Sequence, residues 1–105
     1  MAELIVEITR FIDDHFPGFV ECSFLDADGR RHLIVDKVPV FTFEDLFADS
    51  AYPRPGIIRC QIEREWTDED GRRLAFINTE NPSGVETAEG LSTFTVLRSQ
   101  LSASA

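Results

Sequence analysis

The chain has 105 residues, of which 43% are hydrophobic and 28% are charged. It is long enough for one compact domain and too short for a multidomain enzyme, and its composition is that of a folded globular protein rather than a disordered one. Nineteen acidic residues against ten basic residues give a formal net charge of -9, which repels phosphate backbones and anionic membranes. We therefore expect no nucleic-acid partner and no membrane partner.

The cysteines and the apolar segments point to a compartment. Cys22 and Cys60 are too few for the disulfide framework of a small secreted domain. No apolar stretch approaches the ~20 residues that cross a bilayer, and no basic segment precedes an apolar one at the N-terminus. We therefore expect a cytoplasmic protein with two reduced, buried thiols.

Residues 3–14 are compatible with two structures. Their apolar side chains match one stripe of a helix, whereas Leu4, Val6 and Ile8 alternate as in a strand. Five of the residues 5–12 are β-branched, and no N-cap residue precedes them, which favours a strand. A helix packed on a sheet stays open as the alternative.

Two short segments of the chain repeat each other at an offset of 42 residues. They are Phe24–Arg31 (FLDADGRR) and Trp66–Arg73 (WTDEDGRR). An aspartate side chain can accept hydrogen bonds from the backbone ahead of it, and the glycine can take the positive φ that closes a tight loop. Each segment therefore predicts the tip of a β-hairpin.

The residues beside the two tips support this prediction. Apolar and polar residues alternate there, which is the period of a half-buried strand. The alternating apolar residues are Val20, Cys22 and Phe24 followed by Leu33 and Val35 in the first hairpin, and Ile58, Cys60 and Ile62 followed by Leu74 and Phe76 in the second. We predict two hairpins whose inward faces carry these side chains.

Between the hairpins, the pattern changes twice. Val38–Phe41 is predicted to be an edge strand, since Pro39 cannot donate a backbone hydrogen bond to a neighbouring strand. Thr42–Phe47 is predicted to be a short capped helix, because Thr42 precedes Asp45 by three residues and the apolar residues have helical spacing.

The remaining segments complete a mainly β architecture. Thr79–Ser92 is predicted to be a long loop and Thr93–Leu97 a final strand, within one domain of residues 1–98 that ends in a frayed tail over residues 99–105. The fold class is a small antiparallel β-barrel or rolled sheet of five to six strands with one short helix, its interior filled by the nine phenylalanines. The alternative is an α+β fold with an N-terminal helix packed on the sheet.

No motif in the sequence predicts catalytic chemistry. There is no nucleophile elbow and no phosphate-binding loop, and His15 and His32 belong to no zinc-binding pattern. A calcium loop built on either tip glycine would end at Val35 or Ile77, where a carboxylate is required. We therefore expect no catalytic, cofactor-binding or metal-binding residues, and we assign the tip aspartates to turn formation.

The second hairpin carries the candidate partner-binding residues. Tryptophan and arginine are enriched among interface hot spots, and this hairpin holds the only tryptophan. A cap over the end of the barrel is the alternative role of that ring. The candidates are Arg64, Trp66, Asp68, Asp70 and Arg72.

Two functions remain open on the sequence alone. A net charge of -9 speeds encounter with a basic protein, which favours a non-enzymatic module that docks or neutralises a basic protein partner through its hairpin tips and residues 79–92. The alternative is a small-molecule carrier or minor enzyme with a pocket at the barrel mouth, lined by Arg64, Trp66, Glu63 and Glu65. The sequence does not indicate an oligomeric state.

Two resemblances can be recognised in the chain. Pro55–Ile58, which leads into a strand and then an acidic Gly-Arg tip, resembles the start of the last β-barrel domain of bacterial translation elongation factors of the Tu type. The aromatic and proline-rich segment that follows in that family is missing here, so no partner site is carried over. The chain as a whole is similar to small bacterial proteins in which Phe-Pro-Gly is followed by Asp-Gly-Arg, a resemblance that implies no particular activity.

Overall fold

The N-terminal segment of the computed structural model is a strand, β1 (Ala2–Asp13). Leu4, Val6 and Ile8 are buried, whereas Ile5 is half exposed, as the two-residue period of a strand requires. The strand prediction is confirmed. The alternative with an N-terminal helix packed on the sheet is wrong, because the β-branched side chains of this segment alternate between the core and the solvent.

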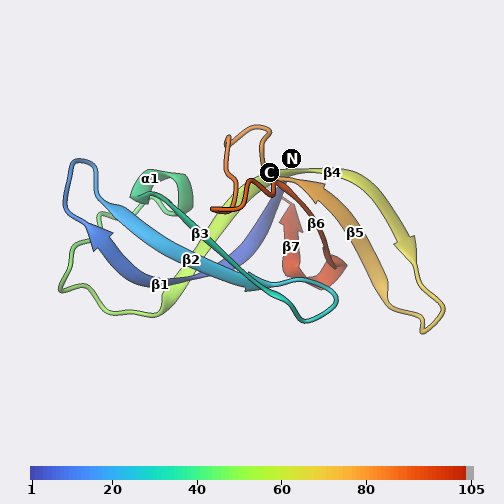
Figure 1. Ribbon diagram of the computed structural model, residues 1–105. Coiled ribbons are helices and arrows are strands. Elements are labelled where there is room, and N and C mark those ends of the chain that lie inside the picture. The colour runs from blue at the N-terminus through green and yellow to red at the C-terminus, as the bar shows by residue number, and fades with distance from the viewer. Residues whose placement is uncertain (104–105) are drawn as a thin grey trace.

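Residues 1–103 are described by the structure, and they form a curled antiparallel sheet and one short helix (Figure 1). After β1, the elements are β2 (Phe19–Leu25), β3 (Arg31–Lys37), α1 (Val38–Phe41), β4 (Arg54–Thr67), β5 (Arg73–Asn78), β6 (Thr93–Leu97), the 3-10 turn η1 (Arg98–Gln100) and β7 (Leu101–Ala103). The strand order is β3-β2-β1-β4-β5-β6, and β7 pairs with β1. The sheet curls into a half-barrel, so the predicted rolled antiparallel fold is confirmed.

Strand β1 joins the two hairpins at the centre of the sheet. It pairs antiparallel with β4 over Ala2–Ile8 and with β2 over Glu7–Asp13. Gly56 of β4 makes the close approach possible, because a Cβ at this position would lie 2.8 Å from Cγ1 of Ile8. The absence of a side chain at Gly56 therefore lets β1 and β4 pair closely at this point.

Both predicted hairpins form, but the predicted inward face of β3 is wrong. Ile34 is buried, whereas Leu33 and Val35 are 46% and 51% exposed. Ile34 lies directly opposite the buried Cys22 on β2, and directly opposite residues share a face of the sheet. Leu33, Ile34 and Val35 are all apolar, so the sequence does not show which of them faces the core. The register of β3 against β2 decides this.

The two predictions for the segment between the hairpins are wrong. Val38–Phe41 is helical, with Pro39 in the first turn, where its fixed φ is favourable and its missing N–H is not needed. Thr42–Phe47 forms no helix. Val38 and Phe41, the first and last residues of α1, are buried, so the helix lies in the segment before the predicted one. Phe43 and Phe47 lie after the helix and are exposed.

The core is mainly aliphatic. Phe24, Phe41 and Phe94 are buried, but Phe16 and Phe43 are about nine-tenths exposed. The prediction that the nine phenylalanines fill the interior is therefore wrong. Isoleucine, leucine and valine side chains from the strands form most of the buried cluster.

The loop of residues 79–92 is confirmed as irregular, and it packs into the core. Val85 is completely buried. The hydroxyl of Thr79 donates hydrogen bonds to the carbonyl oxygens of Val85 at 2.8 Å and of Ser92 at 3.2 Å. This internal bonding ties the two ends of the loop to its buried centre.

The tail is ordered over most of its length. Leu101–Ala103 pairs with the start of β1, and Leu97 N–H donates to Oε1 of Gln100 at 2.8 Å. The frayed tail predicted for residues 99–105 is therefore wrong for residues 99–103, because η1 continues into a segment whose residues 101–103 pair with β1, and Gln100 is hydrogen bonded to Leu97 and to the carbonyl of Leu25. Residues 104 and 105 lie outside the described part of the chain.

Candidate functional site

The five residues predicted to bind a partner lie together on the hairpin of β4 and β5. The guanidinium carbon of Arg64 is 4.4 Å from the centroid of the Trp66 ring, a cation–π contact on an exposed surface. Trp66 is only half buried. The structure therefore places this ring beside the strand pair, with an arginine over one of its faces.

The other three predicted residues form the tip of that hairpin. Oδ1 of Asp68 accepts hydrogen bonds from the backbone N–H groups of Asp70 at 3.0 Å and Arg72 at 2.9 Å, and Nε of Arg72 donates to its Oδ2 at 2.8 Å. The backbone hydrogen bond from Arg72, helped by the Arg72 guanidinium, holds the pKa of Asp68 below its usual range. The carboxylate is therefore satisfied by its own turn.

The first tip uses its aspartate in the same way. Oδ1 of Asp26 accepts from the backbone N–H groups of Asp28 and Arg30. Within residues 1–103, no group of three His, Cys, Asp or Glu side chains is placed to hold a metal ion. The partner-binding role of the second tip stays a prediction.

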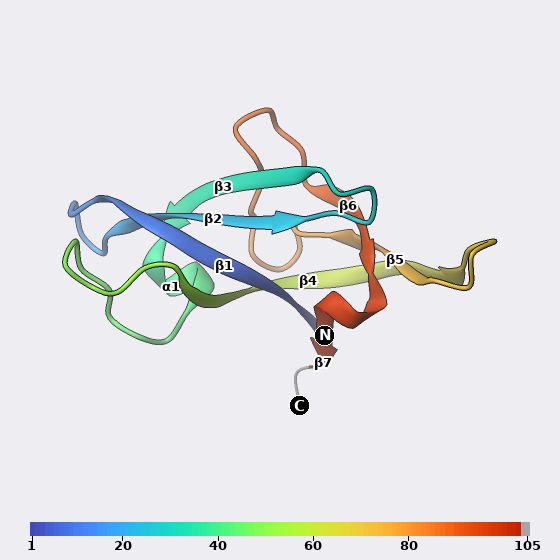
Figure 2. The same cartoon turned by 90° about the horizontal axis from the view of Figure 1, so that it is seen from below.

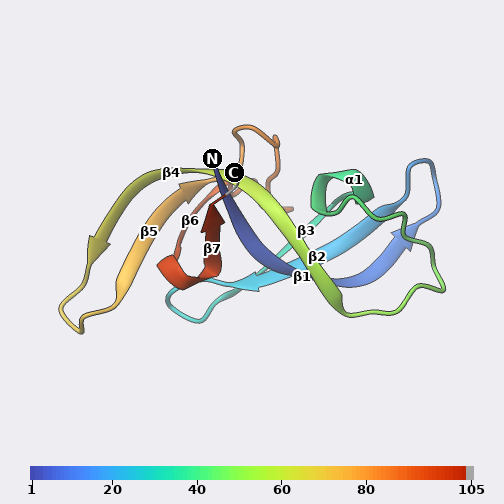
Figure 3. The same ribbon diagram turned by 180° about the vertical axis from the view of Figure 1, so that it is seen from behind.

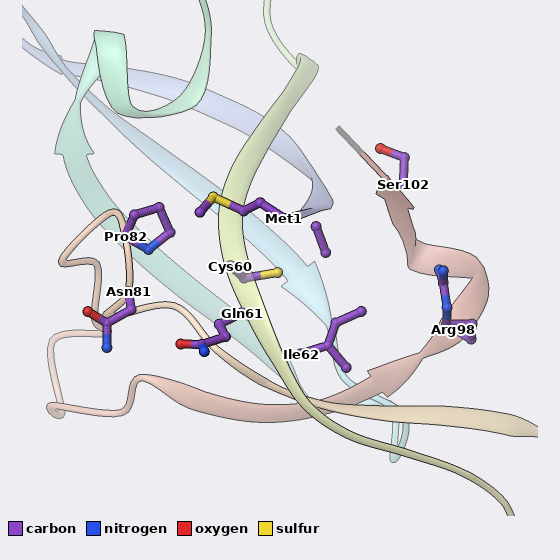
Figure 4. Close-up of a pocket in the computed structure, with 9 residues that line it drawn as sticks. Met1, Cys60, Gln61, Ile62, Asn81, Pro82, Arg98 and Ser102 are labelled. Atoms are coloured by element: carbon purple, nitrogen blue, oxygen red, sulfur yellow. The ribbon is translucent and has the colours of Figure 1, made fainter. Parts of the chain in front are cut away.

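One pocket lies between β4, the 79–92 loop and the C-terminal segment, with a volume of about 620 Å³ (Figure 4). Cys60 and Ile62 lie along one wall, Asn81 and Pro82 on a second, and Arg98 on the side of η1. This pocket is the geometric candidate for a small ligand. Its residues differ from those predicted for a pocket at the barrel mouth.

The arginine of this pocket already has partners. Nε of Arg98 donates to Oε1 of Glu65 at 2.9 Å, and its Nη1 donates to the carbonyl of Leu101 at 3.3 Å. Burial raises the pKa of the Cys60 thiol to about 11. A thiol that stays protonated at neutral pH is a poor nucleophile, so Cys60 is not an activated nucleophile.

The turn between β1 and β2 and the chain that follows α1 lie at the same end of the sheet (Figures 1 and 3). A second cavity is lined by residues of these two segments. Its volume is about 690 Å³. Phe11 and the buried Leu46 contribute to its lining. Its rim carries Phe16, Phe43, Phe47, Asp14, Glu44 and Asp45, and we call this site the phenylalanine groove.

The three rim phenylalanines are unusually exposed for apolar side chains. Phe16 is 91% exposed, Phe43 90% and Phe47 61%. Phe16 lies in the turn before Pro17, and Phe43 follows the helix that Pro39 starts. Contiguous exposed apolar side chains with a polar rim mark interaction sites on soluble proteins.

The segment that carries Phe47 is held in place by its own hydrogen bonds. The hydroxyl of Tyr52 donates to the carbonyl of Phe47 at 2.7 Å, and the hydroxyl of Ser50 accepts from the Phe47 N–H at 3.0 Å. The guanidinium carbon of Arg59 lies 5.8 Å from the centre of the Phe43 ring. Hydrogen bonds therefore fix the loop at Phe47, and Arg59 contacts the Phe43 ring.

The charged residues that line the groove are acidic, and two arginines, Arg54 and Arg59, lie against Glu44 and the Phe43 ring at its edge. Asp14, Glu44 and Asp45 line it, and no lysine, arginine or histidine does. Glu44 is paired with Arg54 at 2.8 Å. Asp14 and Asp45 are exposed, and within residues 1–103 neither makes an ion pair or a side-chain hydrogen bond. Two carboxylates are thus free beside three exposed rings.

Sequence reasoning missed this groove. The sequence predicts a short helix over Thr42–Phe47 and an interior filled by the phenylalanines, so Phe16, Phe43 and Phe47 are expected to be buried. The available signal was the local density of aspartate and glutamate around these phenylalanines, since a buried helix face has few charges beside it. Only the fold shows that the turn at Phe16 and the segment after α1 come together.

Comparison of this chain with models of protein families, with curated proteins and with solved structures gives no significant match. In residues 1–103, no helix is both long enough and apolar enough to cross a bilayer. The function is therefore inferred from the surface and its chemistry.

Proposed function

We propose that this protein is a non-enzymatic binding module that docks a basic protein partner in the phenylalanine groove. The observation that carries the proposal is the exposure of Phe16, Phe43 and Phe47 around a cavity that also holds the free carboxylates of Asp14 and Asp45. Exposed aromatic side chains supply apolar contact area, and unpaired carboxylates favour a partner of positive charge.

The overall charge supports the same partner class. The net charge of -9 attracts a basic protein at long range, and the all-acidic lining of the groove continues that attraction at contact distance. The tip aspartates contribute to the long-range field, but Asp26 and Asp68 bind their own turns. The groove is therefore better suited than the tips to direct contact.

The second candidate, a small-molecule carrier or minor enzyme, has less support. The pocket beside Cys60 offers space, but its arginine is already bonded and its thiol is protonated at neutral pH. Arg64 and Trp66 line neither the pocket beside Cys60 nor the phenylalanine groove.

The proposal is tested by affinity capture on the immobilised chain, followed by calorimetry with each purified captured protein. We expect basic proteins that bind at low salt and are released at about 500 mM salt, where charge attraction is screened. The combined substitution of Phe16, Phe43 and Phe47 by serine should weaken binding at least ~10-fold, which corresponds to about 1.4 kcal/mol.

A matched control keeps the test specific. Leu33 and Val35 are also exposed, but they lie on β3 outside the groove. The Leu33→Ser, Val35→Ser double variant should bind as the native chain does. Captured proteins that bind the native chain and the triple serine variant equally would contradict the proposal.

A further inference from the structure

The backbone around the groove argues against binding by strand addition. Beyond Ile8, β1 has left β4 and pairs only with β2, so one of its edges is open beside the groove. That part of β1 contains two register shifts, between Ile8 and Arg10 and between Phe11 and Asp13. Irregularities of this kind bend an edge and prevent regular pairing with an added strand.

The side chains of the groove favour a different geometry. Phe16 comes from one side and Phe43 and Phe47 come from the other, with the partly buried Phe11 and the buried Leu46 also lining the cavity. An apolar groove lined by side chains accepts the apolar stripe of a helix, with anchors at i, i+3, i+4 and i+7. The volume of about 690 Å³ is within the range of specific binding cavities.

The charges of the rim specify the other face of that helix. Asp14 and Asp45 have no ion-pair partner within residues 1–103, so each can pair with a lysine or arginine that flanks the apolar stripe. The same carboxylates oppose an anionic lipid surface, which exposed phenylalanines would otherwise suit. Charge complementarity therefore selects a basic protein segment over a membrane.

We propose that the phenylalanine groove binds a basic amphipathic helix of the partner protein, with the apolar stripe on Phe16, Phe43 and Phe47 and flanking cations on Asp14 and Asp45. This inference rests on the proposed function and adds the conformation and charge pattern of the bound segment. The three rings provide most of the affinity. The two carboxylates select a positively charged segment and make its binding dependent on salt.

The experiment uses fluorescently labelled peptides and the full chain, with fluorescence anisotropy as the readout. The first probe has about 18 leucine and lysine residues with leucines at i, i+3, i+4 and i+7, which makes a basic amphipathic helix. The second has the same composition in strict alternation, which favours a strand. The third replaces lysine by glutamate in the helical pattern. We expect the first peptide to bind about 10-fold or more tightly than either of the others.

Two sets of variants locate the binding. Serine at Phe16, Phe43 and Phe47 should weaken binding of the helical lysine peptide about 10-fold or more, and Asp14→Asn with Asp45→Asn should weaken it about 3-fold or more and flatten its salt dependence. All five side chains are exposed, so these variants should fold, and circular dichroism checks that they do. The Leu33→Ser, Val35→Ser control should bind as the native chain does.

The outcomes separate this inference from the proposed function. Equal binding of the alternating and helical lysine peptides would overturn the proposal that the bound segment is a helix. The proposed function, binding of a basic protein in the groove, would remain. Binding of neither lysine peptide overturns both proposals. Flotation of the chain with vesicles of phosphatidylcholine and phosphatidylglycerol, lost on substitution of the three phenylalanines, overturns the protein partner in favour of a lipid surface.

Discussion

The two Asp-x-Asp-Gly-Arg tips have the same local structure. In each, Oδ1 of the first aspartate accepts hydrogen bonds from the backbone N–H groups two and four residues ahead, at 2.9 to 3.0 Å. Gly29 and Gly71 have φ values of 82° and 81° and donate to the carbonyl of that aspartate. A few residues of sequence therefore specify the whole turn.

The surroundings of the two tips differ. The first tip packs on β6, where Ala27 N–H donates to the carbonyl of Thr95 at 2.8 Å and the Phe24 ring meets Phe94 edge-on at 5.0 Å. The second tip extends away from the half-barrel (Figure 2), and its contact with the first tip is a hydrogen bond from Nη1 of Arg72 to the carbonyl of Ala27 at 3.1 Å. Trp66, in the position equivalent to Phe24, is only half buried.

The second carboxylate oxygen, Oδ2, has a different partner in Asp26 and in Asp68. Oδ2 of Asp26 accepts from Nε2 of His32 at 2.8 Å, and that imidazole lies 4.8 Å from the Phe94 ring. Oδ2 of Asp68 accepts from the exposed Arg72 guanidinium instead. Local sequence fixes the turn, and tertiary packing decides whether the turn also stabilises the half-barrel.

The largest difference is expected for the equivalent aromatic residues. Phe24→Ala should lower the free energy of unfolding by about 3–5 kcal/mol, because it leaves a cavity against Phe94 and His32. Trp66→Ala should lower it by only about 1–2 kcal/mol, since the ring is half buried and contacts Arg64 on an exposed face. Urea denaturation of both variants measures the two values, and equal losses would contradict the asymmetry.

A smaller difference is expected for the aspartates themselves. Asp26→Ala should lower the free energy of unfolding by about 2 kcal/mol, because it leaves the backbone N–H groups of the turn and the His32 ring without their acceptor. Asp68→Ala should have the smaller effect, since solvent replaces the lost hydrogen bonds of an exposed tip. Thermal denaturation at neutral pH gives the order, which a larger loss for Asp68→Ala would reverse.

The contribution of Asp26 to the free energy of unfolding should depend on pH. Burial raises the pKa of Asp26, but the hydrogen bonds from His32 and from the backbone of Arg30 and Asp28 outweigh it and leave the pKa lowered. The carboxylate therefore stabilises the fold fully above about pH 4, and this contribution is lost as the pH falls through the lower pKa of the folded state. The difference in unfolding free energy between native chain and Asp26→Ala should shrink on acidification, and a constant difference would show that the charged form is not what stabilises the tip.

The turns were predictable because every group that shapes them lies within a few residues. The sequence favours a strand for β1, because Leu4, Val6 and Ile8 alternate and the segment is rich in β-branched residues, but its apolar spacing also fits a helix. The inward face of β3 was not predictable, since Leu33, Ile34 and Val35 are all apolar and the choice among them comes from the pairing with β2. The role of His32 depends on Phe94, which no short-range pattern connects to it.

The phenylalanine groove was hidden for the same reason. Its two rims come from the turn at Phe16 and from the chain after Phe41, which the curled sheet brings together. A helical spacing from Phe43 to Phe47 is real in the sequence, but Pro39 starts the helix earlier and the segment after it is left exposed. A spacing pattern within one segment does not show such competition between neighbouring segments.

The smallest difference is expected at the glycines, where the two tips should behave alike. Gly29→Ala and Gly71→Ala each force a side chain into the positive-φ region, at a cost of about 1 kcal/mol. A Cβ at either position meets no atom within 4 Å, so packing adds nothing to the backbone term at either tip. Equal shifts in the urea midpoint of the two variants would confirm that the turns are the same local structure. A distinctly larger shift for Gly29→Ala would show that docking on β6 constrains the backbone of the first tip as well as its side chains.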